Sequence, residues 1–157
     1  MSLGKKIQIR AAKKADIEWI NQRYEEVDFI PSIFEKEIIG VAEYEGKRAG
    51  IGRLVTIDEH NLELGGMYVF EAYRGQGIAK ELVTFLLKKA HLFQTVYCIP
   101  FEHLSAFYMQ YGFVSCSNLE EVPPEVVAKH AWCKQQYPHP TSLLFLQKLR
   151  YAPFPFL

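Results

Sequence analysis

Residues 62–80 read LELGGMYVFEAYRGQGIAK and carry the strongest structural signal in the chain. An apolar, strand-like run passes through small residues directly into an amphipathic helix. The free backbone N–H groups at the start of a helix, together with the helix dipole, form a site for phosphate. Gly75 and Gly77 have no Cβ atom, so an anion can approach the main chain, and Arg74 and Lys80 add positive charge. The segment therefore predicts a phosphate-binding turn between a strand and a helix.

Two common phosphate-loop patterns do not match this turn. The P-loop requires Gly-Lys followed by Ser or Thr, and the chain contains no such tripeptide. A dinucleotide fingerprint would need glycine at position 80, which is Lys80. What remains is Arg-x-x-Gly-x-Ala, formed by Arg74, Gly77 and Ala79 after a strand that ends in Met67-Tyr68-Val69. The alternative is that the glycines only relieve crowding between strand and helix.

The sequence resembles the GNAT family of N-acetyltransferases over YVFEAYRGQGIAKELVTFLL, residues 68–87. In that family this strand, loop and helix bind the pyrophosphate of acetyl-coenzyme A. The resemblance implies that the diphosphate is held by Arg74, Gly75, Gln76, Gly77, Ile78, Ala79 and Lys80. It also implies that main-chain groups of Met67 and Val69 hold the thioester and the pantetheine arm, beside a bulge at Gly65-Gly66. Acetyl-CoA is then the co-substrate.

A second motif, Phe107-Tyr108-Met109-Gln110-Tyr111-Gly112-Phe113, resembles the (Leu/Phe)-Tyr-x-x-x-Gly-Phe helix of the same family. The resemblance makes Tyr108 the general acid that protonates the departing coenzyme A thiolate, which a phenol with a pKa of about 10 can do. The alternative is that Tyr108 is one more aromatic residue on this helix. One departure is Phe101, where the family often has Asn; His103 and Ser105 are candidate replacements.

Acetyl transfer also needs a base, because an alkylammonium with a pKa of about 10.4 is not nucleophilic. Glu63 lies on the strand beside the expected bulge, where several family members have an acidic residue. The alternatives are an ordered water as the base and a structural Glu63, exposed and paired across the hairpin. Glu71 is too close to the phosphate loop to serve.

The remaining patterns predict an α/β chain with strands at residues 7–9, 38–44, 48–57, 62–69, 95–99, 113–116 and 142–149. Helices are predicted from residue 16 to about 27, over 78–90 and 104–111, and from 123 to about 136. The segment 29–37 has no clean period and borders the expected substrate region. The resemblance implies a GNAT-like mixed sheet flanked by helices and splayed between its fourth and fifth strands. We expect one domain over residues 1–157, with its core at about 5–150 and an aromatic tail at 151–157.

The amino-acid composition of the chain argues against several classes of binding partner. The 18 basic and 18 acidic residues balance, which argues against nucleic acid, and no apolar run is long enough for a membrane span. Three cysteines without a C-x-x-C pair favour a reducing, cytoplasmic setting, and His130, Cys133 and His139 lack a fourth partner for zinc. The aromatic tail indicates docking on this chain or on a second copy, in a homodimer.

The expected activity is therefore direct transfer of an acetyl group to a primary amine on a small molecule or a peptide. The segments expected to choose the acceptor carry no pattern that identifies it. A noncatalytic acyl-CoA sensor and an interaction module are the alternatives from other functional classes.

Overall fold

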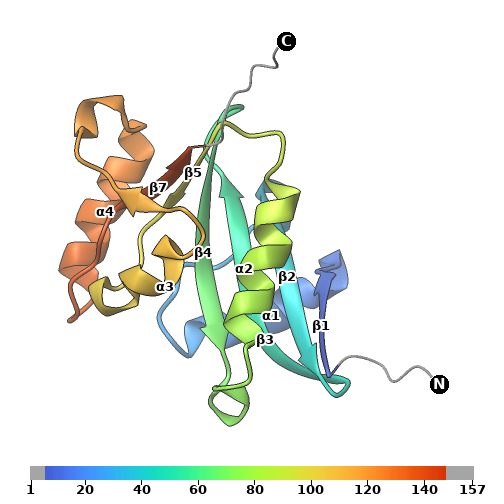
Figure 1. Ribbon diagram of the computed structural model, residues 1–157. Coiled ribbons are helices and arrows are strands. Elements are labelled where there is room, and N and C mark those ends of the chain that lie inside the picture. The colour runs from blue at the N-terminus through green and yellow to red at the C-terminus, as the bar shows by residue number, and fades with distance from the viewer. Residues whose placement is uncertain (1–5, 148–157) are drawn as a thin grey trace. The chain divides into compact units, whose positions relative to one another are not determined.

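The computed structural model describes residues 6–147, and they form two compact units (Figure 1). One unit comprises the described residues up to Val55 together with Gly65–His91, and the other comprises Thr56–Leu64 and the described residues from Leu92 onward. Strand β4 (Asn61–Val69) contributes to both units. The hydrogen-bonded strand order is β1-β2-β3-β4-β5-β7-β6, which confirms the predicted mixed sheet. The expectation of a single domain stays a prediction.

The first unit is built on an antiparallel meander. Strands β1 (Ile7–Ala11) and β3 (Lys47–Thr56) pair on either side of β2 (Glu37–Tyr44). The turn between the strands predicted at 38–44 and 48–57 contains two residues, Glu45 and Gly46, which adopt positive φ angles of 50° and 83°. Such a two-residue turn matches the right-handed twist of the flanking strands.

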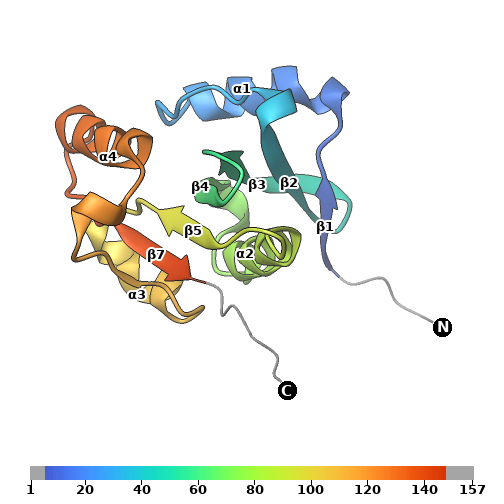
Figure 2. The same cartoon turned by 90° about the horizontal axis from the view of Figure 1, so that it is seen from above.

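Two helices cover opposite faces of this meander (Figure 2). Helix α1 (Ile17–Glu25) buries Ile20 and Tyr24 against apolar residues of β2 and β3. Helix α2 (Ile78–Lys89) buries Ile78 and Leu82 against the other face. Burying one such aliphatic side chain contributes about 1.5–3 kcal/mol. The helical spacing of the apolar residues in 78–90 thus predicts α2 correctly.

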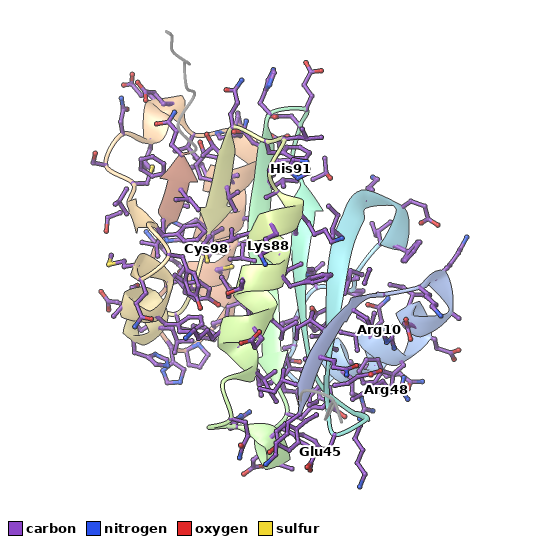
Figure 3. The ribbon with its side chains drawn as sticks, turned by 45° about the vertical axis from the view of Figure 1, so that its right-hand side comes forward. Arg10, Glu45, Arg48, Lys88, His91 and Cys98 are labelled. Atoms are coloured by element: carbon purple, nitrogen blue, oxygen red, sulfur yellow. The ribbon has the colours of Figure 1, made fainter. Side chains whose placement is uncertain are left out.

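The charges at the end of α2 complement the helix dipole. Lys88 lies in its last turn, and the neighbouring His91 lies just beyond its end, with Nδ1 3.1 Å from the Lys88 carbonyl oxygen (Figure 3). Cations at a helix C-terminus interact favourably with the helix dipole. The exposed Lys88-Lys89 pair is therefore accounted for as a solvated helix end, and the helix N-terminus is left for the glycine turn.

The second unit contains the first half of β4 with β5 (Thr95–Cys98), β7 (Leu144–Gln147) and β6 (Val114–Ser115). The pair β4–β5 is parallel and β7 is antiparallel to both β5 and β6. Helix α4 (Pro124–Gln136) packs Val126 against Tyr97, and Val122, which precedes the helix, joins the same cluster. Helix α3 (Ser105–Met109) lies on the opposite face (Figure 2).

Short 3-10 helices connect these elements at Lys14–Asp16, Phe34–Lys36, Glu71–Tyr73, Glu102–Leu104 and Leu119–Glu121. Two of them account for local differences from the predictions. The helix expected over 104–111 is shorter because a 3-10 turn precedes it and Gly112, at φ 102°, ends the segment. The segment 29–37 holds another such turn. Residues 148–149 of the last predicted strand and the aromatic tail 151–157 lie outside the described residues.

None of the helices formed within residues 6–147 has the length and apolar character that crossing a membrane requires.

Candidate active site

The glycine turn opens helix α2. Gly77 is the N-cap residue at φ 87°, and Gly75 has φ 81°. A Cβ atom built on either glycine would meet no atom within 4 Å. The two glycines therefore relieve no crowding between strand and helix, so that alternative is wrong. They leave open space in front of the main chain, together with backbone angles that other residues resist.

The backbone around this turn presents free donors. In the part of the chain that the structure describes, the N–H groups of Gly75, Gly77, Ile78 and Ala79 have no hydrogen-bond partner. They lie at the positive end of a helix of 12 residues. Unsatisfied N–H groups and the helix dipole together favour an anion at this place. These free donors and the helix start lie within one unit, and phosphate binding at the turn stays a prediction.

Side chains join this turn to neighbouring strands. The Nε atom of Arg74 donates to the carbonyl oxygen of Val69 at 3.1 Å, which ties the turn to the end of β4. The hydroxyl of Tyr44 donates to Oε1 of Gln76 at 3.4 Å. Arg74, Gln76 and Lys80 are exposed, so their charge and polar atoms are accessible to a ligand.

Strand β4 changes its pairing and its backbone conformation near its middle. Its parallel register with β5 runs from Asn61↔Thr95 to Leu64↔Cys98, while β4 itself continues to Val69. Gly66, in the predicted bulge, has φ 59°, a left-handed angle that is unusual within a strand. This local change in backbone direction precedes Met67, which is predicted to hold the thioester.

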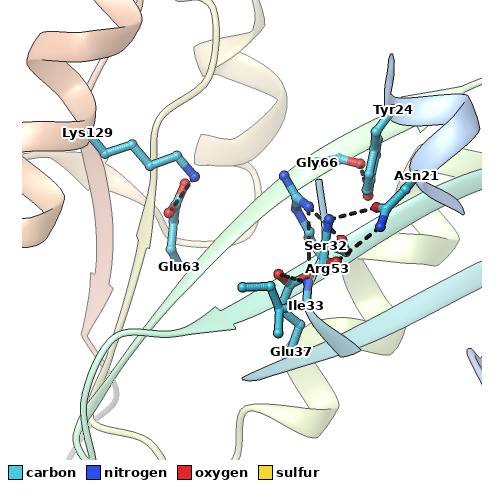
Figure 4. Close-up of polar contacts among 9 residues, drawn as sticks. All are labelled: Asn21, Tyr24, Ser32, Ile33, Glu37, Arg53, Glu63, Gly66 and Lys129. Carbon is cyan, nitrogen blue, oxygen red and sulfur yellow. Dashed lines mark hydrogen bonds and ion pairs between the residues drawn. The ribbon is translucent and has the colours of Figure 1, made fainter. Parts of the chain in front are cut away.

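A buried polar cluster surrounds Gly66, and the motifs did not predict it (Figure 4). The Tyr24 hydroxyl donates to the Gly66 carbonyl oxygen at 2.7 Å. The Arg53 guanidinium lies 4.4 Å from the centre of the Tyr24 ring and donates to Oγ of Ser32 at 2.6 Å. Its Nη1 atom is 3.7 Å from Oε1 of Glu37. The lone arginine in the apolar run GIGRLV of β3 is the signal that could have indicated a buried partner.

Glu63 lies in the second unit and faces helix α4. Its carboxylate accepts from the Lys129 ammonium at 2.9 Å (Figure 4). The expectation of an exposed Glu63 paired across the hairpin is wrong, because the residue is only 6% exposed and its partner lies on α4. A partner 66 residues away in sequence leaves no local pattern that would predict it.

Tyr108 is the buried residue of helix α3. It is 6% exposed, and its ring contacts Phe107 and Phe113 edge to face. Burial raises the pKa of its phenol well above the usual value of 10.0, and the nearby Cys98 adds to the increase.

The residues considered as replacements for the missing Asn have structural roles. The ring of His103 stacks on Phe101, with centroids 6.2 Å apart, and the Ser105 hydroxyl donates to Ser142 at 3.0 Å. Cys98 is buried on β5 (Figure 3), as expected for a small apolar side chain, and burial raises the pKa of its thiol. No three His, Cys, Asp or Glu residues of the described chain are grouped to hold a metal ion.

Residues 35–115, just over half of the 157-residue chain, match the family model described as an acetyltransferase (GNAT) domain. The chain belongs to the GNAT family of acetyltransferases. The match includes the turn at the start of α2 and extends through Tyr108, so both motifs of this GNAT chain lie inside it. No curated protein is significantly similar to it in sequence.

Solved structures share the GNAT fold. A Mycobacterium tuberculosis protein in complex with CoA has a TM-score of 0.72 at 23% identity, over 90% of this chain and 99% of that one. A GNAT acetyltransferase from Elizabethkingia anophelis, with acetyl-CoA bound, has a TM-score of 0.65 at 17% identity, over 92% and 100%. Neisseria gonorrhoeae N-acetylglutamate synthase, complexed with coenzyme A and L-arginine, has a TM-score of 0.72 at 15% identity. That match covers 94% of this chain and 34% of the synthase, so the GNAT chain spans about a third of that enzyme.

Proposed function

We propose that this GNAT chain transfers an acetyl group from acetyl-CoA to a primary amine. The observation that carries the proposal is the turn before α2, with four free N–H groups and open space at Gly75 and Gly77. A diphosphate fits such a site because its oxygens accept from main-chain donors and its charge is stabilised by the dipole. The CoA and acetyl-CoA complexes among proteins of the same fold support this choice of co-substrate.

In the proposed reaction the amine nitrogen forms a bond to the thioester carbon as the carbon–sulfur bond breaks. The Met67 N–H group polarises the carbonyl oxygen, on which negative charge develops. The Tyr108 hydroxyl gives its proton to the departing sulfur, the nitrogen releases a proton to solvent as it becomes an amide, and Tyr108 regains a proton from solvent. The residues of the turn, Arg74 to Lys80, and the main chain of Met67 and Val69 orient the co-substrate, so the chemistry needs no covalent enzyme intermediate.

The proton of the acceptor ammonium leaves before attack, and we assign its removal to Glu63 or to a water that Glu63 orients. The Glu63 carboxylate lies 2.9 Å from the Lys129 ammonium, and in this proposal it accepts the proton through such a water. The same ion pair also serves the packing of α4, so Glu63 combines a structural contact with the proposed role. The acceptor itself is proposed only as a class, a primary amine of a small molecule or a peptide.

A noncatalytic acyl-CoA sensor is the second candidate function. The observation that favours it is Phe101, which occupies the position of the family's Asn and packs against His103 and Tyr137. Thiol release from acetyl-CoA with a panel of primary amines separates the two proposals. Binding of CoA without release of thiol on any amine favours the sensor.

Gly77→Ala is expected to weaken coenzyme A binding about 10-fold, because the new Cβ enters the space in front of the free N–H groups. Gly46→Ala is the matched control, since Gly46 in the β2–β3 turn has φ 83° and equally open surroundings. Both variants should lose about 1–2 kcal/mol of stability from the positive φ angle. Calorimetric titration with coenzyme A then measures the site alone. Equal affinities in the two variants, or no binding to the unmodified chain, would contradict the proposed diphosphate site.

The pH dependence of kcat gives a further prediction. Because burial raises the pKa of Tyr108 above 10.0, its neutral, proton-donating form persists where a free tyrosine ionises. Activity that needs this proton is present below the raised pKa and is lost only above it. We therefore expect no fall in kcat from Tyr108 between about pH 7 and pH 10. A falling limb below pH 10 that disappears in Tyr108→Phe would show that the phenol ionises within this range, and would contradict the raised pKa on which this prediction rests.

A further inference from the structure

The cluster around Gly66 is one continuous polar network within the first unit (Figure 4). It starts at Asn21 on α1, which exchanges two hydrogen bonds with the main chain of Ser32, at 2.7 and 3.1 Å. The Ser32 hydroxyl accepts from Arg53 at 2.6 Å, and the guanidinium lies against the ring of Tyr24. Tyr24 ends the network by donating to the carbonyl oxygen of Gly66 at 2.7 Å.

The last of these hydrogen bonds fixes more than a carbonyl group. The carbonyl of Gly66 and the N–H of Met67 belong to one peptide bond, which is planar, and none of the described peptide bonds is cis. In a trans peptide these two groups point in opposite directions. A donor that fixes the Gly66 oxygen therefore fixes the direction of the Met67 N–H group, which points away from Tyr24.

We propose that Tyr24, supported by Arg53, is the positioning residue that aims the Met67 N–H group at the thioester carbonyl. This inference rests on the proposed acetyl transfer and adds residues that the two GNAT motifs do not contain. Tyr24 and Arg53 act through the backbone and touch no reacting atom.

Several observations support a fixed geometry for this peptide. Tyr24 has no exposed surface, and burial raises the pKa of its phenol, so the hydroxyl stays a donor. Glu37 holds Arg53 from the far side, and its second carboxylate oxygen accepts from the Ile33 N–H at 2.9 Å. A Cβ atom on Gly66 would lie 2.6 Å from the Tyr24 hydroxyl and 2.7 Å from Arg53 Nε. The site therefore tolerates only glycine beside these two side chains.

The network also explains how the segment before β2 contributes. Ser32 is buried at 5% exposure, although its neighbours Ile30 and Ile33 are exposed. The segment is thus anchored by the buried Ser32, and the side chains of Ile30 and Ile33 on either side of it are exposed to solvent. Its buried contact supports Arg53, while its exposed apolar side chains remain available to an acceptor.

Tyr24→Phe tests the inference, because it removes the hydroxyl and keeps the ring under Arg53. Tyr68→Phe is the matched control, since the Tyr68 hydroxyl also joins β4 to the end of α1, at 3.0 Å from Glu26, without contacting Gly66. We expect kcat to fall about 10-fold in Tyr24→Phe, a fraction of the loss seen when an oxyanion donor is removed, and less than 2-fold in Tyr68→Phe. The affinity for coenzyme A, which has no thioester carbonyl, should stay within 2-fold of the unmodified value in both.

A spectroscopic readout separates positioning from loss of structure. The infrared carbonyl band of ¹³C-labelled acetyl-CoA, bound without acceptor, should move to lower frequency on the unmodified chain and move less on Tyr24→Phe. Arg53→Lys, which retains the charge but not the planar stack on Tyr24, should give an intermediate band if it folds. The same band and kcat in Tyr24→Phe and Tyr68→Phe would overturn the inference. If the unmodified chain binds no acetyl-CoA or acetylates no amine, the proposed function fails instead.

Discussion

Replacing Tyr108 with phenylalanine is expected to lower kcat for acetyl transfer about 100-fold, the lower end of what a general acid contributes. The ring stays, and with it the edge-to-face contacts to Phe107 and Phe113, so the fold and the affinity for coenzyme A should change little. The loss arises because the thiolate must then leave unprotonated or take its proton from water.

Tyr111→Phe provides the control for this measurement. Tyr111 follows α3 in the same motif, and its ring also packs on Phe107, at 5.6 Å between centroids. Steady-state thiol release at saturating acetyl-CoA should separate the two variants by more than 10-fold in kcat if Tyr108 alone supplies the proton. Comparable rates in both would make Tyr108 a packing residue and would leave the acid to another group or to water.

The elements that the sequence predicted well are those whose signals are local. The spacing of apolar residues in 78–90 and the glycines before it depend on neighbours within a few positions, and α2 begins at Ile78 as that pattern requires. The two-residue turn at Glu45-Gly46 is equally local. The predicted first and last residues of the elements were less accurate, as at α3, because a single hydrogen bond decides whether a residue belongs to a 3-10 turn or to a helix terminus.

The sequence predicted the parts of the site that are local in the chain and missed the contacts between distant residues. Residues 74–80 form the expected turn because a glycine turn and a helix N-terminus are consecutive in sequence. The ion pair of Glu63 with Lys129, and the hydrogen bond from Tyr24 to Gly66, join positions 66 and 42 residues apart. Such contacts depend on how strands and helices pack, and a single sequence holds no periodic signal for them. The isolated charge of Arg53 among apolar residues is a local signal that could have indicated a buried partner, but it was not used.

Replacing Arg53 with methionine is expected to cost about 3–5 kcal/mol of unfolding free energy, the range for removing one member of a buried ion pair. The side chains of Arg53 and Glu37 are only 5% and 6% exposed. Methionine fills much of the arginine volume but leaves the Glu37 carboxylate in the interior with the Ile33 N–H as its remaining donor. The penalty is therefore that of an unpaired buried charge, with a smaller part from the lost stack on Tyr24.

The double variant Arg53→Met/Glu37→Gln separates these contributions, because it removes the unpaired charge while keeping the volume of residue 37. It should recover more than half of the loss, as expected when both members of a buried pair are replaced. Arg10→Met is the matched control: Arg10 bonds Asp16 at 2.8 Å and Glu43 at 3.1 Å, but its side chain is 33% exposed. Its loss should be about 1 kcal/mol, since water reaches and screens this partly exposed pair. Urea titrations of the four chains measure all of these values. Equal losses in Arg10→Met and Arg53→Met would mean that burial of the Arg53–Glu37 pair has no energetic consequence, and the rigidity assigned to the network around Gly66 would then lack its basis.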